Sequence, residues 1–371
     1  MLDLAVLVSC TLAALFLYRC TSEIVNAQWR LWARRAVGFG AFLIWTNEIL
    51  GVQRIAVLFN HSVLEWTRCA GLVAGGILLY SAAIVAILRT AGAFEPGRRR
   101  VLQLAAVAAV AAPVVLGTRA FIRRDDLTFR ELDVKIKGLP KDLDGLRIAQ
   151  LTDIHLSAFL DEATLRRAVG MLNETDPHLT VVTGDLISTK GDPLDTCIRN
   201  LAQLRSSSGL WGCLGNHERF AMAEEYTERE SARLGLRFLR HQAVPLRFGD
   251  SSVNLVGVDY QRRGLPYLVG TESLIDPKAF NILLTHNPDV FPVAARQGFD
   301  LTVGGHTHGG QVTLEILHPT LNAARFYTPF TYGLYERGDK QMYVSRGIGT
   351  IGVPARLGAP PEVVLLRLCA I

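Results

Sequence analysis

Five short clusters of metal-binding residue types are spread over the second half of the chain. The clusters are Asp153-Ile-His155, Gly184-Asp185, Gly215-Asn216-His217-Glu218, Thr285-His286 and Gly305-His306-Thr307-His308. Imidazole, carboxylate and amide groups together suit Zn, Mn or Fe ions, whereas Ca prefers oxygen ligands alone. Two such ions about 3.5 to 4 Å apart can clamp a phosphoryl group and lower the pKa of a shared water, so that hydroxide forms near neutral pH. The clusters therefore indicate a phosphoester-hydrolysing site with two divalent or trivalent metal ions.

Each cluster follows a short run of Val, Ile and Leu that is typical of a buried strand. The predicted strands are Leu146–Ile154, Leu179–Thr183, Gly209–Leu214, Asn281–Thr285 and Leu301–Val303. Ligand crevices in α/β sheets form at the carboxyl ends of strands, so we expect the clusters to meet at one rim. Asp153 and His155 should alternate on one strand face. One cluster alone would be better explained as a turn or a hydrogen-bonded core, but such a core has no need to gather five clusters.

The rest of this half predicts an α/β (α+β) domain. Helices are expected at Asp161–Asn173, Leu194–Leu204 and Ala221–Leu234, an edge strand at Leu127–Ile136, a hairpin within Phe238–Asp259, and late strands at Met342–Ser345 and Val363–Leu368. Strands alternating with helices favour α/β, and the crowding of strands late in the chain favours a second sheet packed on the first.

In order and composition, the five clusters resemble the signature of the calcineurin-like metallophosphoesterases over about residues 145–310, with no ligand missing. The resemblance implies a four-layer fold in which two β-sheets pack face to face with helices outside. The tracts His286-Asn287-Pro288 and Gly309-Gly310-Gln311 are similar to those of bacterial phosphodiesterase-like members with N-terminal membrane or export segments.

The resemblance also implies a role for each cluster residue. The two ligand sets are Asp153, His155, Asp185 and His308 for the first metal, and Asp185, Asn216, His286 and His306 for the second. Asp185, alone after its strand, is the natural bridging carboxylate. His217 would contact a phosphoryl oxygen and protonate the leaving group, a task that suits an imidazole. Glu218 is expected to brace its loop rather than bind metal.

The first 120 residues differ from the rest. Hydrophobic residues make up 49% of the whole chain, yet 20% is charged, which indicates a membrane part and a soluble part. The apolar segments are Leu4–Tyr18, about Ala36–Val52, Gly71–Leu88 and Val101–Gly117. A bilayer core about 30 Å thick needs about 20 helical residues, so the last two are long enough and the first two are marginal. We therefore expect about four transmembrane helices over residues 1–120 and the metallophosphoesterase domain over residues 125–371.

Arginines in the connections predict the orientation. The first connection holds Arg19, Arg30, Arg34 and Arg35, the second Arg54 and Arg68, and the third Arg89, Arg98, Arg99 and Arg100. The positive-inside rule then puts connections one and three in the cytoplasm and the catalytic domain outside the cell (inner) membrane. Arginines after the last segment weaken this asymmetry. The tract from Gly97 fits either a twin-arginine export signal or an arginine anchor, and both place it inside.

The sequence leaves several functions open. The leading one is a membrane-anchored phosphoesterase acting on a phosphomonoester or phosphodiester, with a lipid or envelope substrate compatible with the tether. Membrane-associated relatives suggest a UDP-2,3-diacylglucosamine-type pyrophosphatase of lipid A synthesis, which would require a cytoplasmic domain. A non-catalytic metal-binding scaffold is disfavoured because the ligand set is complete. The net charge of +5 is spread out and predicts no nucleic-acid partner. Oligomeric state is open, and Cys197 and Cys213 could pair if the domain is exported.

Overall fold

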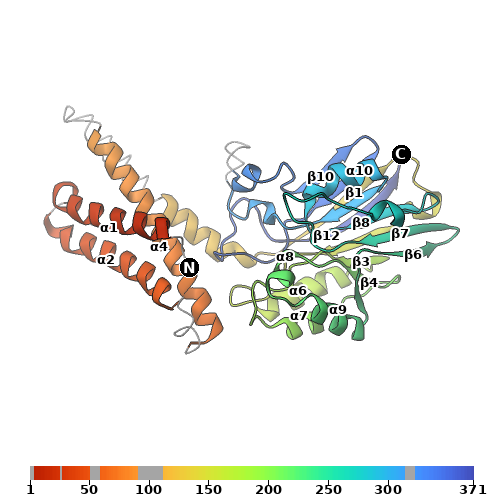
Figure 1. Ribbon diagram of the computed structural model, residues 1–371, viewed down its shortest axis with the longest axis horizontal. Coiled ribbons are helices and arrows are strands. Elements are labelled where there is room, and N and C mark those ends of the chain that lie inside the picture. Colours follow the sequence, from red (N-terminus) through yellow and green to blue (C-terminus); the bar gives the residue numbers. More distant parts are fainter. Residues whose placement is uncertain (1–3, 26, 51–58, 91–111, 314–321) are drawn as a thin grey trace. The chain divides into compact units, whose positions relative to one another are not determined.

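The structure is a computed structural model that describes residues 4–25, 27–50, 59–90, 112–313 and 322–371 (Figure 1). The chain divides into two compact units. One comprises Met1–Arg119 with Gly352–Pro354, and the other comprises Ala120–Ile351 with Ala355–Ile371.

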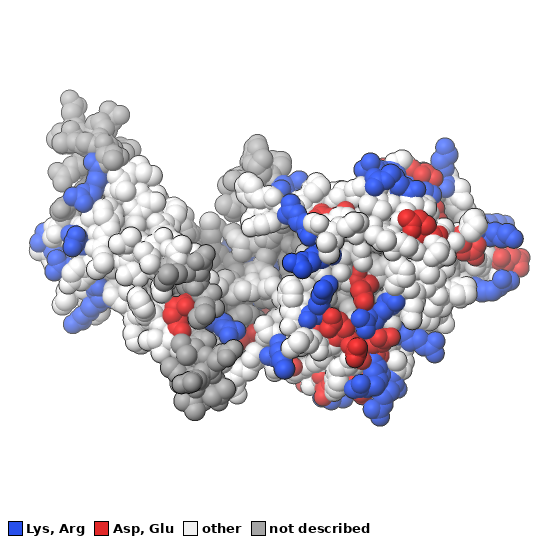
Figure 2. Space-filling view, in the orientation of Figure 1, with Lys and Arg blue, Asp and Glu red and all other residues white. Residues whose placement is uncertain are grey.

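The N-terminal unit contains three long helices, α1 (Leu4–Ile24), α2 (Ala27–Leu50) and α4 (His61–Thr90). They pack around a small apolar core that includes Cys10, Ala14, Ile44 and Leu78. Figure 2 shows that the visible surface of these helices is mostly uncharged, with arginine side chains gathered near one end.

Two of the described helices are long and apolar enough to cross a membrane, at Ala5–Ser22 and His61–Ile87. The first is longer than the marginal segment predicted to end at Tyr18, and α4 begins well before the predicted Gly71. Helix α2 is not among these candidates, because the charged residues Arg30, Arg34, Arg35 and Glu48 interrupt its apolar run. Of the fourth predicted segment, residues 112–117 are helical, and the rest lies outside the described residues, as does the Gly97 tract.

The second unit contains two six-stranded sheets. In spatial order, the first sheet consists of β1 (Thr128–Ile136), β12 (Glu362–Ala370), β2 (Arg147–Leu151), β3 (Leu179–Val182), β4 (Leu210–Gly212) and β5 (Leu236–Phe238). The second consists of β10 (Gly333–Arg337), β11 (Lys340–Val344), β9 (Leu301–Gly304), β8 (Phe280–Leu284), β7 (Ser251–Gly257) and β6 (Gln242–Phe248). Strands β2 to β5 are mutually parallel, and so are β7, β8 and β9. Their carboxyl ends therefore share one edge in each sheet.

The alternation of side chains along the strands builds the layers. Ile148 and Val181 of the first sheet share a core with Leu284 and Val303 of the second. The adjacent residue Ala149 faces the other way, into a core shared with the helices α6 (Glu162–Asn173) and α7 (Leu194–Leu201). Helices α6, α7 and α9 (Glu224–Arg233) lie beside the first sheet (Figure 1), and α10 (Phe291–Gln297) contributes to a core with β7 and β8. The expected four-layer fold, two packed sheets flanked by helices, is confirmed.

Most predicted elements are present with small shifts. Strand β1 lies at the edge of its sheet, as its alternation predicted, and β6 and β7 form the expected antiparallel hairpin. The helix predicted at Ala221–Leu234 is instead a short helix, α8 (Asn216–Phe220), followed by α9. Met222 has a φ of 54°, and this left-handed backbone separates the two helices.

Candidate metal centre

The five sequence clusters meet at the edge where β2, β3, β4, β8 and β9 end. Several of their residues have a left-handed backbone, with φ of 49° at Asp153, 48° at His155, 55° at Asp185 and 50° at His308. The prediction that Asp153 and His155 alternate on a strand face is wrong, because β2 ends at Leu151. Sharp turns rather than strand pleating therefore aim these side chains.

One group combines Asp153, His155 and His308, whose ligand atoms all lie within 4.8 Å of one another. The Nε2 atoms of His155 and His308 are 3.1 Å apart, and Nε2 of His308 is 3.5 Å from Oδ1 of Asp153. All three residues are buried. Nδ1 of His155 faces the Ser188 hydroxyl at 3.2 Å, so the opposite ring nitrogen points at the group.

A second group combines Asp185, His286 and His306. Nε2 of His286 is 3.0 Å from Oδ2 of Asp185 and 3.2 Å from Nδ1 of His306. Nδ1 of His286 donates to the carbonyl of Thr183 at 2.7 Å. That bond fixes the ring and leaves Nε2 as the nitrogen directed at the group, the arrangement typical of a metal-binding imidazole.

Asp185 connects the two groups. Its Oδ2 also lies 3.5 Å from Nε2 of His155 and 4.0 Å from Nε2 of His217. The predicted amide ligand Asn216 is buried, and its Oδ1 has no hydrogen-bond partner in the described part of the chain. A buried amide oxygen without a donor is costly unless it meets a cation. The donor set therefore fits bound metal ions.

His217 lies at the more open side of the site. Its side chain retains some exposure, whereas that of His155 has none. The two rings meet edge to face, with centroids 4.7 Å apart. Nδ1 of His217 donates to the carbonyl oxygen of Ser188, because a carbonyl can only accept. His217 also falls within 4.8 Å of ligand atoms of His155 and Asp185, so it is close enough to act on the same bound group.

Glu218 braces the loops, as predicted. Its carboxylate is fully buried and accepts hydrogen bonds from the backbone N–H groups of Asp185 (3.0 Å), Leu186 (2.7 Å) and Gly215 (2.8 Å). Gly215 is required for the same approach, since a Cβ there would lie 2.1 Å from Oδ1 of Asp185. The loops after β3 and β4 are thus locked together beneath the bridging carboxylate.

Arg356 is a supporting residue that the sequence analysis missed. It is 3% exposed, and its guanidinium donates to the carbonyls of His308 (2.9 Å), Gly349 (3.1 Å) and Arg346 (2.9 Å). Its Nη2 also lies 3.2 Å from Nδ1 of His308. The only available signal was a lone arginine in the Gly- and Pro-rich tract 347–361.

Burial sets the protonation of most of these imidazoles. It lowers the pKa of His155 to about 3 and that of His306 to about 4, and it holds the pKa of His308 well below the ordinary value. These three rings are therefore neutral at pH 7, which is the form that binds metal. Burial also raises the pKa of Asp153 to about 6.

His286 and Asp185 behave as an ion pair. Burial would lower the pKa of His286, but the charge and hydrogen bond of Asp185 outweigh it and raise this pKa to about 10. Burial would likewise raise the pKa of Asp185, but the imidazoles of His286, His155 and His217 hold it well below the usual range. The Asp185 carboxylate is thus paired with the imidazolium of His286.

Residues 146–310 match the family model described as calcineurin-like phosphoesterase. The chain is 35% identical over 244 residues to "Uncharacterized metallophosphoesterase Cj0846" of Campylobacter jejuni, covering 64% of this chain and 62% of that protein. It is 30% identical over 245 residues to "Uncharacterized metallophosphoesterase YkuE" of Bacillus subtilis, covering 64% and 84%. It is 31% identical over 255 residues to the bovine "Transmembrane protein with metallophosphoesterase domain", covering 64% and 56%.

The chain thus spans less than two thirds of the Campylobacter and bovine relatives. The apolar helices and the bovine relative's name suggest membrane association. The family match, the relatives' names and the grouped His and Asp residues support a metal-dependent phosphoester hydrolase. The chain belongs to the calcineurin-like metallophosphoesterase family.

Proposed function

We propose that the protein is a membrane-anchored phosphoesterase that hydrolyses a phosphomonoester or phosphodiester at a centre of two metal ions. The position of Asp185 supports this most strongly, because one carboxylate oxygen faces imidazoles of both ligand groups. A carboxylate that reaches both groups can hold two adjacent cations close together.

The ligand sets are those expected from the sequence. Asp153, His155, Asp185 and His308 would hold the first metal, and Asp185, Asn216, His286 and His306 would hold the second. When bound, Zn, Mn or Fe ions would polarise the phosphoryl oxygens and make an attacking water more acidic. The neutral state of His155, His306 and His308 leaves their lone pairs free for this task.

His217 is the proton donor in this proposal. Its Nδ1–H is occupied by the carbonyl of Ser188, so the proton that it transfers is carried on Nε2. The hydrogen bond to the carbonyl orients the ring. As the P–O bond breaks, Nε2 would give its proton to the leaving oxygen, which otherwise departs as a costly alkoxide.

The helices α1 and α4 support a membrane anchor. We retain the multi-pass arrangement in the cell membrane, an extracytoplasmic catalytic domain, and a lipid or envelope substrate as parts of the proposal. They follow from the arginine distribution between the apolar segments and from the tether itself.

The test is turnover by the full-length protein in detergent, stripped of metal and then reloaded with Mn²⁺ or Zn²⁺. Chromogenic phosphomonoesters and phosphodiesters should be hydrolysed, and Asp185→Asn should reduce turnover by at least about 1,000-fold, because both ligand sets lose a member. Asp250→Asn is the matched control, since Asp250 is exposed in the β6–β7 turn. A metal-loaded protein that hydrolyses no phosphoester would contradict the proposal.

A further inference from the structure

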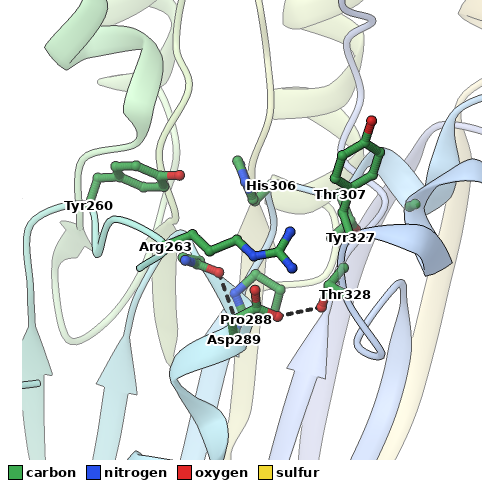
Figure 3. A pocket seen from close by; sticks show the side chains of 10 residues that line it. Tyr260, Arg263, Pro288, Asp289, His306, Thr307, Tyr327 and Thr328 are labelled. Atoms are coloured by element: carbon green, nitrogen blue, oxygen red, sulfur yellow. Dashed lines mark hydrogen bonds between the residues drawn. The ribbon is translucent and has the colours of Figure 1, made fainter. Parts of the chain in front are cut away.

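A pocket of about 310 Å³ adjoins the metal centre at His306 (Figure 3). Its other walls come from the segment after β7, the segment after β8, and residues 324–328. The ring of Tyr260 in one wall lies 5.6 Å from the ring of His306, centroid to centroid. A substrate whose phosphoryl group reaches the metal ligands can therefore extend into this pocket, an inference that rests on the proposed function.

The pocket walls suit a polar occupant. All of its lining residues except Pro288 and Ala324 carry a polar side chain. Tyr260 and Tyr327 lie on opposite sides of the pocket, and their rings can contact a compact organic group (Figure 3). An acyl chain would leave the polar groups without partners, which is costly.

Arg263 is the positively charged arginine in the pocket wall. Its guanidinium extends toward the middle of the pocket (Figure 3), and within the described residues it makes no hydrogen bond or ion pair. The other charged wall residue, Asp289, accepts a hydrogen bond from the hydroxyl of Thr328.

A guanidinium that has no partner among the described residues and lies in a polar pocket matches phosphate or carboxylate, which it can bind through two parallel hydrogen bonds. We propose that this pocket binds the organic part of the substrate, that this part is polar and carries a second anionic group, and that Arg263 selects for that group. Asp289 suits a hydroxyl on the same organic part, since a carboxylate accepts hydrogen bonds and repels anions.

The test compares two soluble probes that differ by one phosphate, thymidine 3′,5′-bisphosphate and thymidine 5′-monophosphate. Their Kd values are measured by calorimetry with the full-length, Mn²⁺-loaded protein in detergent. A charged hydrogen bond predicts that the bisphosphate binds about 10- to 100-fold more tightly. Arg263→Gln should abolish the difference between the probes, and Arg263→Lys should restore part of it. Arg262→Gln is the matched control, since the neighbouring arginine is exposed and does not line the pocket.

A second experiment, with lipids as competitors, shows whether the anionic group belongs to a lipid headgroup or to a soluble substrate. Cardiolipin and phosphatidylglycerol in mixed micelles are compared as competitors of the soluble bisphosphate. If cardiolipin competes and phosphatidylglycerol does not, and Arg263→Gln removes this competition, the anionic group belongs to a lipid headgroup. If neither lipid competes, the substrate is soluble.

Turnover of bis(p-nitrophenyl) phosphate separates this inference from the proposed function. If the protein turns over this ester but binds the two nucleotides with equal affinity, the inference is overturned and the proposed hydrolase function still stands. A bisphosphate preference that depends on Arg263, without turnover, supports the subsite and counts against hydrolysis. Binding of neither nucleotide, or an equal effect of Arg262→Gln and Arg263→Gln, overturns the inference.

Discussion

The Nε2 atoms of His155 and His308 lie 3.1 Å apart, although 153 residues separate them in the chain. Each ring is held from its other side, His155 by the Ser188 hydroxyl and His308 by the Arg356 guanidinium. Burial keeps both rings neutral at pH 7. Two imidazole nitrogens fixed this closely and backed by separate supports suit a shared cation.

Removing one ligand from either group should lower the metal affinity of that group and leave the other group's affinity largely unchanged. His308→Ala and His286→Ala are each expected to weaken binding at one site by at least about 100-fold, since even supporting residues cost 10- to 100-fold. Metal content per chain after gel filtration, measured by mass spectrometry, should fall by about one ion in each variant. His241→Ala is the control, because His241 is exposed and belongs to neither group. Full metal content in both ligand variants would show that these residues do not bind metal.

Metal uptake should release protons in a pH-dependent way. His286, with its pKa raised to about 10, carries a proton at pH 7.5 that a cation must displace. Apparent affinity should therefore rise with pH up to about 10. Below about 6 Asp153 also takes up a proton, so the affinity should fall more steeply there. Calorimetry in buffers of different ionisation enthalpy counts the protons, and uptake without proton release at pH 7.5 would contradict this assignment.

His217→Asn should affect substrates according to their leaving group. An alkyl phosphoester needs a proton donor, so its kcat should fall by about 100- to 10,000-fold. A p-nitrophenyl ester, whose leaving group is a stable anion, should lose much less. Steady-state kinetics on the two esters measure this split, and metal analysis checks the variant. An equal loss on both esters, accompanied by loss of metal, would make His217 a ligand instead of the acid.

Arg356→Met should destabilise the domain and loosen the metal centre. The change leaves the carbonyls of Gly349 and Arg346 without their donor, at a cost of about 1 to 3 kcal/mol for each buried unsatisfied group, whereas the His308 carbonyl keeps the hydrogen bond from the N–H of Gln311. Thermal unfolding should therefore shift downward, and Co²⁺ bound to the variant should show an altered visible spectrum because His308 is no longer held. Arg356→Lys should recover part of the spectrum.

The control for Arg356→Met is Arg367→Met, a change to an exposed arginine paired with Asp133. Its unfolding midpoint and Co²⁺ spectrum should match the parent protein. If Arg356→Met left the spectrum unchanged while lowering stability, its role would be in the fold alone.

The sequence predicted the strands that end at the metal centre well, because each is a short apolar run followed directly by one of the five clusters of metal-binding residue types. Val181 and Asp185 illustrate this, since one lies in the core and the other begins the site four residues later. The left-handed backbone at Asp153 and His155 was not predictable from composition, because loop contacts rather than local propensity impose it. Arg356 was missed because its partners come from His308 and from residues 346–349, and only the folded chain brings these together.

The pocket beside the metal centre was not identified from the sequence. Tyr260, Arg263 and Tyr327 line it, and all three lie in connections between predicted strands and helices. The sequence could not distinguish Arg263 from Arg262, because the two arginines are adjacent in one loop and both are exposed. The paired state of Cys197 and Cys213 was open from the sequence, and both thiols are free and buried.

Anomalous diffraction from crystals of the Mn²⁺-loaded protein tests the two-metal centre most directly. The account predicts two peaks about 3.5 to 4 Å apart, one beside His155 and His308 and the other beside His286 and His306, with the Asp185 carboxylate between them. A single peak, or two peaks of which only one contacts Asp185, would contradict it.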